Sequence, residues 1–366
     1  MKDSFVKLLQ RAIQKDASDI HLKTDSPPFF RVDGDMRRQP DEPIDVEQMD
    51  SIVRHMLSEE QLTRFLRKGE IDLSFSQKGV GRFRVNMFRQ RGSVSLVMRR
   101  IKTKILGFDQ LHLPPSVERF AMMARGLILV TGTTGSGKST TLASIIDYIN
   151  ETRRCHIITV EDPIEYIHTD KQSVVNQREV SIDTADFQTA LRAAMREDPD
   201  VILIGEMRDV ETFQAAVTAA ETGHLVFSTL HTTNVMQTID RIVDLFPTTQ
   251  QDQVRSALAM QLRAIMCMRL LPRADGHGRV PACEILFVNP AVRALIRESR
   301  VAMLGVAIQQ GREAGMQTFN DSLCSHIKKG LITQEQGMEA SDNPEELSMM
   351  LQGITLGSMR GGILRG

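Results

Sequence analysis

The chain of 366 residues lacks the features that mark membrane, secreted or nucleic-acid-binding proteins. No uninterrupted apolar run approaches the roughly 20 residues that a membrane-spanning helix needs. The formal net charge is −1, so the basic excess typical of a nucleic-acid-binding protein is missing. The four cysteines are scattered without paired spacing, which favours reduced thiols in a cytosolic protein over disulfides or a zinc site. The first residues lack the apolar core of a signal peptide, so we expect no secretory signal.

The most informative segment that is present is TGTTGSGKSTT at residues 131–141. It follows the apolar run 126–130 and precedes a helical pattern over 140–150, which is the strand–loop–helix context of a P-loop. Because its glycines carry no side chains, the loop can turn backbone N–H groups toward phosphate oxygens. A glycine-rich turn that only joins a strand to a helix would not need Gly-Lys-Ser at this spacing. The segment therefore predicts a site for a nucleoside triphosphate, ATP, with Mg²⁺.

The residue types of this loop also predict individual roles. Lys138 is placed to reach the β- and γ-phosphates, and Ser139 offers its hydroxyl to the metal. The expected nucleotide contacts in the loop are Thr133, Thr134, Gly135, Ser136, Gly137, Lys138, Ser139 and Thr140.

Acidic side chains follow two further apolar strand patterns. One strand leads into Glu161-Asp162-Pro-Ile-Glu165, and the other leads into Gly205-Glu206. In a P-loop ATPase a carboxylate near the γ-phosphate holds Mg²⁺ or activates water, so we predict Glu206 as the general base and Glu165 as a support of the metal shell. Gly205 occupies the usual place of the Walker B aspartate, which argues against direct contact between an aspartate and the metal. Glu161 and Asp162 could also orient metal-bound waters, although for Asp162 a structural role as a helix N-cap or in a turn fits the sequence as well.

A histidine and two arginines complete the candidates on this side of the chain. His231 follows the strand pattern 225–228, and we predict that it senses the γ-phosphate, because functional residues gather at the carboxyl ends of parallel strands. Arg192 and Arg196 lie four residues apart on one predicted helix face. They could reach a neighbouring subunit, but pairing with surface carboxylates is the simpler interpretation.

The order of these patterns predicts two domains. Residues 1–101 contain a short amphipathic helix, strands near 20–22 and 29–32, a helical pattern over 46–67 and three strands from 71 to 101, which together indicate a small α+β domain on an antiparallel sheet. Residues 102–117 lose periodicity and are predicted as a linker. From 118 to 352 strands alternate with helices, which predicts an α/β fold with a parallel sheet, mostly helical after about 235. Residues 353–366 are predicted to form a flexible tail.

One strand of the first domain carries arginines on a single face. Arg82, Arg84 and Asn86 alternate with apolar residues, so they share one side of the strand. Arg89 and Arg99 lie on or beside the same hairpin. This face is either an ordinary solvated surface or a contact for nucleotide phosphates, which arginine can bind with two N–H groups at once.

The motifs ITVEDPIEY, ILIGEMRD and STLHTT, together with the P-loop, resemble the secretion ATPase superfamily in order and spacing. ASDIHL at 17–22 and GRFRVNMFRQRG at 81–92 are similar to the N-terminal PAS-like domain of that family. Within it the chain resembles the branch that powers type IV pilus retraction, because it lacks the tetracysteine motif and the N-terminal extension of the assembly ATPases. AVRALIRE at 291–298 resembles a motif of that branch, although Val292 and Ala294 depart from it.

The resemblance implies a RecA-like P-loop NTPase domain, preceded by a PAS-like domain, in a homohexameric ring. It also implies that Arg84 and Arg99 face the nucleotide phosphates, with Arg82 and Arg89 as weaker candidates. The implied partner is a pilus platform protein of the inner membrane, at which the cytoplasmic ring would act peripherally, without membrane insertion and without nucleic acid.

Other functions fit the same motifs. A pilus assembly ATPase, a type II secretion ATPase or an accessory retraction paralogue differs from a retraction motor mainly in the direction of work. A DNA-translocating ring motor is disfavoured by the near-neutral charge. A small-molecule kinase would need an acceptor pocket and a lid, of which the sequence gives no indication. A nucleotide-binding switch without turnover would not need Glu206.

Overall fold

The computed structural model describes residues 2–32, 34–101 and 104–353. The chain divides into two compact units, Met1–Lys104 with Pro163–Ile167, and Ile105–Asp162 with His168–Gly366. Among the described residues, no helix has the length and apolar character that crossing a membrane requires. Apart from Gly353, the predicted tail 353–366 lies outside the described residues.

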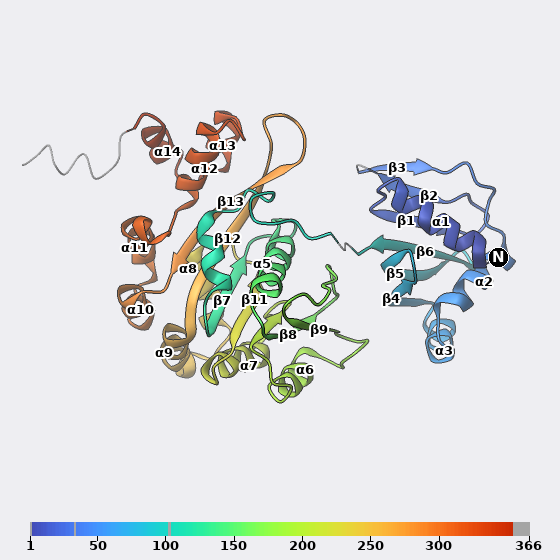
Figure 1. The fold of residues 1–366 in the computed structure, drawn as a ribbon, viewed down its shortest axis with the longest axis horizontal. Coiled ribbons are helices and arrows are strands. Elements are labelled where there is room, and N and C mark those ends of the chain that lie inside the picture. The colour runs from blue at the N-terminus through green and yellow to red at the C-terminus, as the bar shows by residue number, and fades with distance from the viewer. Residues whose placement is uncertain (1, 33, 102–103, 354–366) are drawn as a thin grey trace, which may run out of the picture. The chain divides into compact units, whose positions relative to one another are not determined.

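The first unit is built on a six-stranded sheet in the order β3-β2-β1-β6-β5-β4, in which every neighbouring pair is antiparallel (Figure 1). Its elements are α1 (Lys2–Gln14), β1 (Asp19–Lys23), β2 (Phe29–Val32), β3 (Asp35–Arg38), α2 (Val46–Met56), α3 (Glu59–Lys68), β4 (Glu70–Gln77), β5 (Gly81–Gln90) and β6 (Ser93–Arg100).

The alternation along β5 produces the two faces that the sequence predicts. Phe83, Val85 and Met87 have no exposed surface and join the core of this unit. Arg84 and Asn86 point to the opposite face and are exposed. One face of the sheet is therefore apolar and covered, and the other carries the polar side chains.

Two details of the first unit differ from the sequence prediction. The helical pattern over 46–67 is interrupted, because Leu57 and Ser58 are extended and Ser58 starts α3 with a capping box to Gln61. Strand β3 was not predicted, since all four of its residues are exposed and show no apolar alternation.

The second unit contains a seven-stranded sheet in the order β13-β12-β7-β11-β10-β8-β9 (Figure 1). Its strands are β7 (Gly126–Thr131), β8 (His156–Glu161), β9 (Val174–Glu179), β10 (Val201–Ile204), β11 (Leu225–Leu230), β12 (Leu262–Pro272) and β13 (Arg279–Phe287). Its α-helices are α4 (Glu118–Ala121), α5 (Lys138–Thr152), α6 (Phe187–Ala194), α7 (Val210–Glu221), α8 (Val235–Asp244), α9 (Gln251–Gln261), α10 (Pro290–Arg297), α11 (Leu304–Gln310), α12 (Phe319–Lys328), α13 (Gln334–Ala340) and α14 (Pro344–Leu351).

The centre of this sheet is buried on both faces. Every residue of β7, β10 and β11 is buried, and these strands pair in parallel with their neighbours. Continuous apolar strands of this kind need helices on both sides of the sheet. The predicted α/β fold with a parallel-rich central sheet, preceded by a small α+β part, is confirmed.

The second unit departs from the prediction after about residue 235, where a mostly helical segment without further strands of the sheet was expected. β12 and β13 instead form a long antiparallel hairpin, and β12 also pairs in parallel with β7. The edge strand β9 was missed as well. Most of the segment predicted as a linker, 105–117, belongs to this unit, because Leu113 and Val117 are buried in its core. The exact domain limits stay a prediction.

Candidate active site

The P-loop runs from the end of β7 to the start of α5. Gly132, Gly135 and Gly137 all have positive φ, at 147°, 79° and 98°. At Gly132 a Cβ atom would come within 2.5 Å of the backbone oxygen of Met268 on β12, so a side chain there would collide with the neighbouring strand. Glycine is therefore required at this position both for the backbone angle and for the close approach.

Lys138 is held inside the loop by backbone oxygens. Its ammonium donates to the carbonyl of Gly132 at 2.7 Å and to that of Thr133 at 3.1 Å, and the residue is only 8% exposed. A buried ammonium needs such acceptors, and these place its charge in the concave side of the loop. The side-chain hydroxyl of Ser136 is buried against Gly132 and has no hydrogen-bond partner among the described residues.

The other predicted loop residues are accessible. Thr133, Thr134 and Gly135 are exposed at the tip, while Gly137, Ser139 and Thr140 are half-buried where α5 begins. Backbone N–H groups at the start of a helix are free to bind anions, and the first turn of α5 provides them. The loop thus presents N–H groups, an ammonium and hydroxyls at one place.

Glu206 and His231 lie together at the same edge of the sheet as the P-loop. Glu206 follows β10 and His231 follows β11, and Leu230 is paired with Thr131 at the end of β7. The imidazole Nε2 of His231 is 3.4 Å from Oε2 of Glu206, and Arg208 forms an ion pair with the other oxygen. The side chain of Glu206 is 12% exposed, compared with 52% for His231. The carboxylate is thus shielded, with a polar partner on each side.

Gly205 allows β8 and β10 to approach each other closely at this edge. Its N–H donates to the backbone carbonyl of Val160 at 2.8 Å, and a Cβ at Gly205 would be 3.3 Å from Cα of Glu161. The carboxylate of Glu161 accepts hydrogen bonds from Thr159 and Gln177, at 2.7 and 3.1 Å. Glu161 is therefore held by its own neighbours on β8 and β9.

Glu165 is exposed, and its segment, Pro163–Ile167, groups with the first unit, whereas Glu206 belongs to the second unit. Arg192 is exposed on α6, and Arg196 is exposed just beyond the end of that helix. The predicted roles of all three residues stay predictions.

The arginines of the first unit form a row across its sheet. Arg84 on β5 is paired with Arg99 on β6, Arg99 with Asp19 on β1, and Asp19 with Arg31 on β2. Nε of Arg99 donates to the buried carboxylate of Asp19 at 2.8 Å, and Arg31 lies 3.9 Å from the same carboxylate. Arg84 is exposed at the end of this row.

The chain matches the family model described as Type II/IV secretion system protein over residues 2–338. It belongs to the type II/IV secretion system protein family. The chain is 48% identical over 339 residues to the "Type IV pilus retractation ATPase PilT" of Pseudomonas aeruginosa, covering 93% of this chain and 98% of that one. It is 47% identical over 321 residues to a "Twitching motility protein" of Neisseria gonorrhoeae, covering 88% and 86% of the two chains.

A solved structure has the same fold. The chain superposes on the "Crystal Structure of the Pilus Retraction Motor PilT and Bound ADP" with a TM-score of 0.87 and 50% identity, covering 94% of this chain and 98% of that one.

Two residues that contact predicted site residues, one in each unit, were not predicted from the sequence. Arg208 lies two positions after Glu206 and carries the charge that pairs with it, so a search for cations beside the acidic strand end would have found it. Asp19 is 80 residues from Arg99 in sequence, and only the pairing of β1 with β6 reveals their contact.

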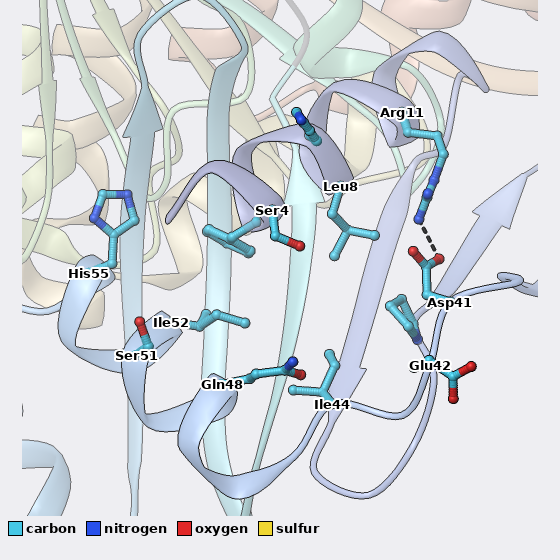
Figure 2. Close-up of a pocket in the computed structure, with 13 residues that line it drawn as sticks. Ser4, Leu8, Arg11, Asp41, Glu42, Ile44, Gln48, Ser51, Ile52 and His55 are labelled. Carbon is cyan, nitrogen blue, oxygen red and sulfur yellow. Dashed lines mark hydrogen bonds and ion pairs between the residues drawn. The ribbon is translucent and has the colours of Figure 1, made fainter. Parts of the chain in front are cut away.

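A separate cavity of about 350 Å³ lies between α1 and α2 of the first unit (Figure 2). Phe5, Leu8, Ile44 and Ile52 are apolar residues of its lining, and the ion pair of Arg11 with Asp41 lies at its edge. None of the predicted site residues lines this cavity.

Proposed function

We propose that this protein is an ATP-hydrolysing motor that powers type IV pilus retraction as a homohexamer. The observation that carries the proposal of hydrolysis is the 3.4 Å approach of His231 to Glu206 beside the P-loop. The similarity to relatives that are named for pilus retraction and twitching motility supports the direction of work.

In the proposed hydrolysis, the described side chains have separate roles. Lys138 and the N–H groups of the loop hold the phosphates, and Glu206 polarises the attacking water. His231, beside Glu206, senses the γ-phosphate. Ion pairing with Arg208 keeps the Glu206 side chain oriented at the strand end.

The residues also fit Mg²⁺, which prefers oxygen ligands and is usually held by one or two protein groups together with the phosphates of the nucleotide. The hydroxyl of Ser139, in the first turn of α5, and the carboxylate of Glu206 are such groups. The metal would neutralise phosphate charge, and Glu165 would support its water shell. Arg84 and Arg99 would add positive charge at the phosphates.

The motor needs a partner on which to act. A platform protein of the inner membrane is the partner that a retraction motor would turn, with the hexamer placed peripherally on its cytoplasmic side. Hydrolysis around the ring would then return pilin subunits to the membrane.

Phosphate release and light scattering, measured together on wild type and Glu206→Gln, test the proposal. We expect a hexamer that hydrolyses ATP, and a variant that still binds ATP but turns over at least about a hundredfold more slowly. Glu221→Gln is the matched control, because Glu221 is exposed at the end of α7, away from the P-loop edge. A monomer would refute the ring. Unchanged turnover in Glu206→Gln would refute the assigned base.

Direction of work needs a cellular test. Expression of the chain in a piliated bacterium without its own retraction ATPase should restore twitching motility. Restored pilus assembly in an assembly-deficient strain, without twitching in the first strain, would favour an assembly ATPase.

A further inference from the structure

A chain of buried hydroxyl and thiol groups joins the end of β7 to α8. Thr131, the last residue of β7, has no exposed surface. Its hydroxyl is 3.1 Å from Sγ of Cys267 on β12 and 3.5 Å from the hydroxyl of Thr238 on α8. The P-loop begins directly after Thr131, so these contacts lie at its base.

Thr238 also bonds to the turn between His231 and α8. Its hydroxyl donates to the carbonyl of Asn234 at 2.8 Å and shares a 2.7 Å hydrogen bond with the hydroxyl of Thr232. Thr238 has no exposed surface, so no water can replace these partners. The residue next to His231 is therefore tied to the same side chain that contacts the base of the P-loop.

A hydrogen bond to Glu284 on β13 holds the other end of the turn. Glu284 accepts a hydrogen bond from the N–H of Val235, the first residue of α8, at 2.7 Å. Burial raises the pKa of the Glu284 carboxyl and that of the Cys267 thiol, which faces it across the hairpin. Buried networks in which each polar group has a partner are rigid, so the turn has little freedom to move alone.

Within the described part of the chain, few contacts fix the side chain of His231. Its side chain is 52% exposed, and its approach to Glu206 is at 3.4 Å. The position of the imidazole therefore depends on the backbone of the turn, and that backbone depends on Thr238.

We infer that Thr238 is a positioning residue for ATP hydrolysis, which keeps the turn carrying His231 in register with the P-loop. It acts through His231 and touches no substrate, so the inference rests on the proposed function of that histidine. A small shift of a group beside the reacting atoms is sufficient to reduce turnover strongly.

The variants Thr238→Val and Thr238→Ser separate the hydroxyl from the shape of the side chain. We expect Thr238→Val to lower kcat for ATP by about tenfold and to change KM by less than about threefold, while Thr238→Ser stays within about threefold of wild type. Thr218→Val is the matched control, because the Thr218 hydroxyl makes the same bond to the carbonyl four residues back but is exposed on α7.

A double-mutant cycle with His231→Ala tests the route of the effect. If Thr238 acts through His231, adding Thr238→Val to His231→Ala causes no further loss of kcat. A further loss in the double variant, or a normal kcat in His231→Ala beside a low one in Thr238→Val, would overturn the inference. So would a normal kcat in Thr238→Val.

Glu206→Gln, measured in the same assay, keeps the two proposals apart. Unchanged turnover in that variant refutes the assigned base, whatever the cycle between Thr238 and His231 shows. Thr232→Val removes only the hydroxyl on the turn and should reproduce the loss of kcat, so it replaces Thr238→Val if that protein does not fold.

Discussion

Nε of Arg99 donates to Oδ1 of Asp19 at 2.8 Å, so an arginine proposed to face phosphate is oriented by a buried carboxylate of its own sheet. Desolvation alone would raise the pKa of Asp19, but the Ser18 hydroxyl and the Arg99 guanidinium outweigh it and hold that pKa below its usual range. The ionised form is therefore favoured by folding. This stabilisation is complete above the unfolded pKa of about 4, and it is lost as the pH falls through the lower folded value.

Asp19→Asn should destabilise the first unit at pH 7 by about 1–3 kcal/mol, since a charged hydrogen-bonded pair is lost. The difference from wild type should shrink as the pH approaches 3. Thermal unfolding of the variant and of wild type at pH 7 and at pH 3 measures this difference. Asp72→Asn is the control, because Asp72 is exposed and bonds to Asn86. An equal effect of the two substitutions would contradict a special role of Asp19.

Gly132→Ala should abolish tight nucleotide binding, because its Cβ would lie 2.5 Å from the backbone oxygen of Met268. Gly135→Ala provides the comparison within the same loop. Gly135 has a φ of 79° but no atom within 4 Å of its Cβ position, so only backbone strain of about 1 kcal/mol is expected. Titration with a fluorescent ATP analogue should show a much larger loss of affinity for Gly132→Ala. Similar affinities of the two variants would mean that the collision is relieved locally.

His168 should make the second unit sensitive to mild acid. Burial lowers the pKa of this imidazole to about 4. Because the unfolded chain binds the proton more tightly, the stabilisation is present above about pH 6.5 and is lost as the pH falls toward 4. His168→Asn should reduce the fall in the thermal midpoint between pH 7 and pH 5. His277→Asn is the control, because His277 is exposed. It should leave the fall in the thermal midpoint between pH 7 and pH 5 unaltered.

Thiol labelling should be selective in the native protein. Cys267 and Cys283 are fully buried, and burial raises the pKa of both thiols, so neither forms the reactive thiolate. Cys324 is buried too, while Cys155 is partly accessible. Mass spectrometry after brief alkylation should find Cys155 modified first. Prompt labelling of Cys283 in folded protein would show that β13 opens.

The sequence predicts well what depends on local pattern. The P-loop needs a buried strand, glycines and a helix start, and all three are consecutive in the chain. Glu206 and His231 could be placed at one edge because parallel strands end together. Their 3.4 Å approach, and the pairing of Arg208 with the same carboxylate, depend on side-chain conformations that no pattern specifies.

The misses have physical causes as well. β12 reads LRAIMCMRLLP, which is rich in good helix formers, and it becomes a strand because β7 and β13 offer hydrogen bonds on both sides. β9 is an edge strand with mixed polar residues, so its pattern is weak. The network around Thr238 joins residues more than 100 positions apart, and only the fold brings them together.

The bonds of Lys138 to the carbonyls of Gly132 and Thr133 have a consequence for recognition. A phosphate arriving at this loop competes with two backbone carbonyls for the N–H groups of a lysine that is already in place. Losing these two bonds offsets part of what Lys138 gains from the γ-phosphate, so the loop alone should distinguish only moderately between a nucleoside diphosphate and a triphosphate. The rest of the discrimination between substrate and product then depends on the neighbouring strand ends, where the proposed ring would sense the progress of hydrolysis.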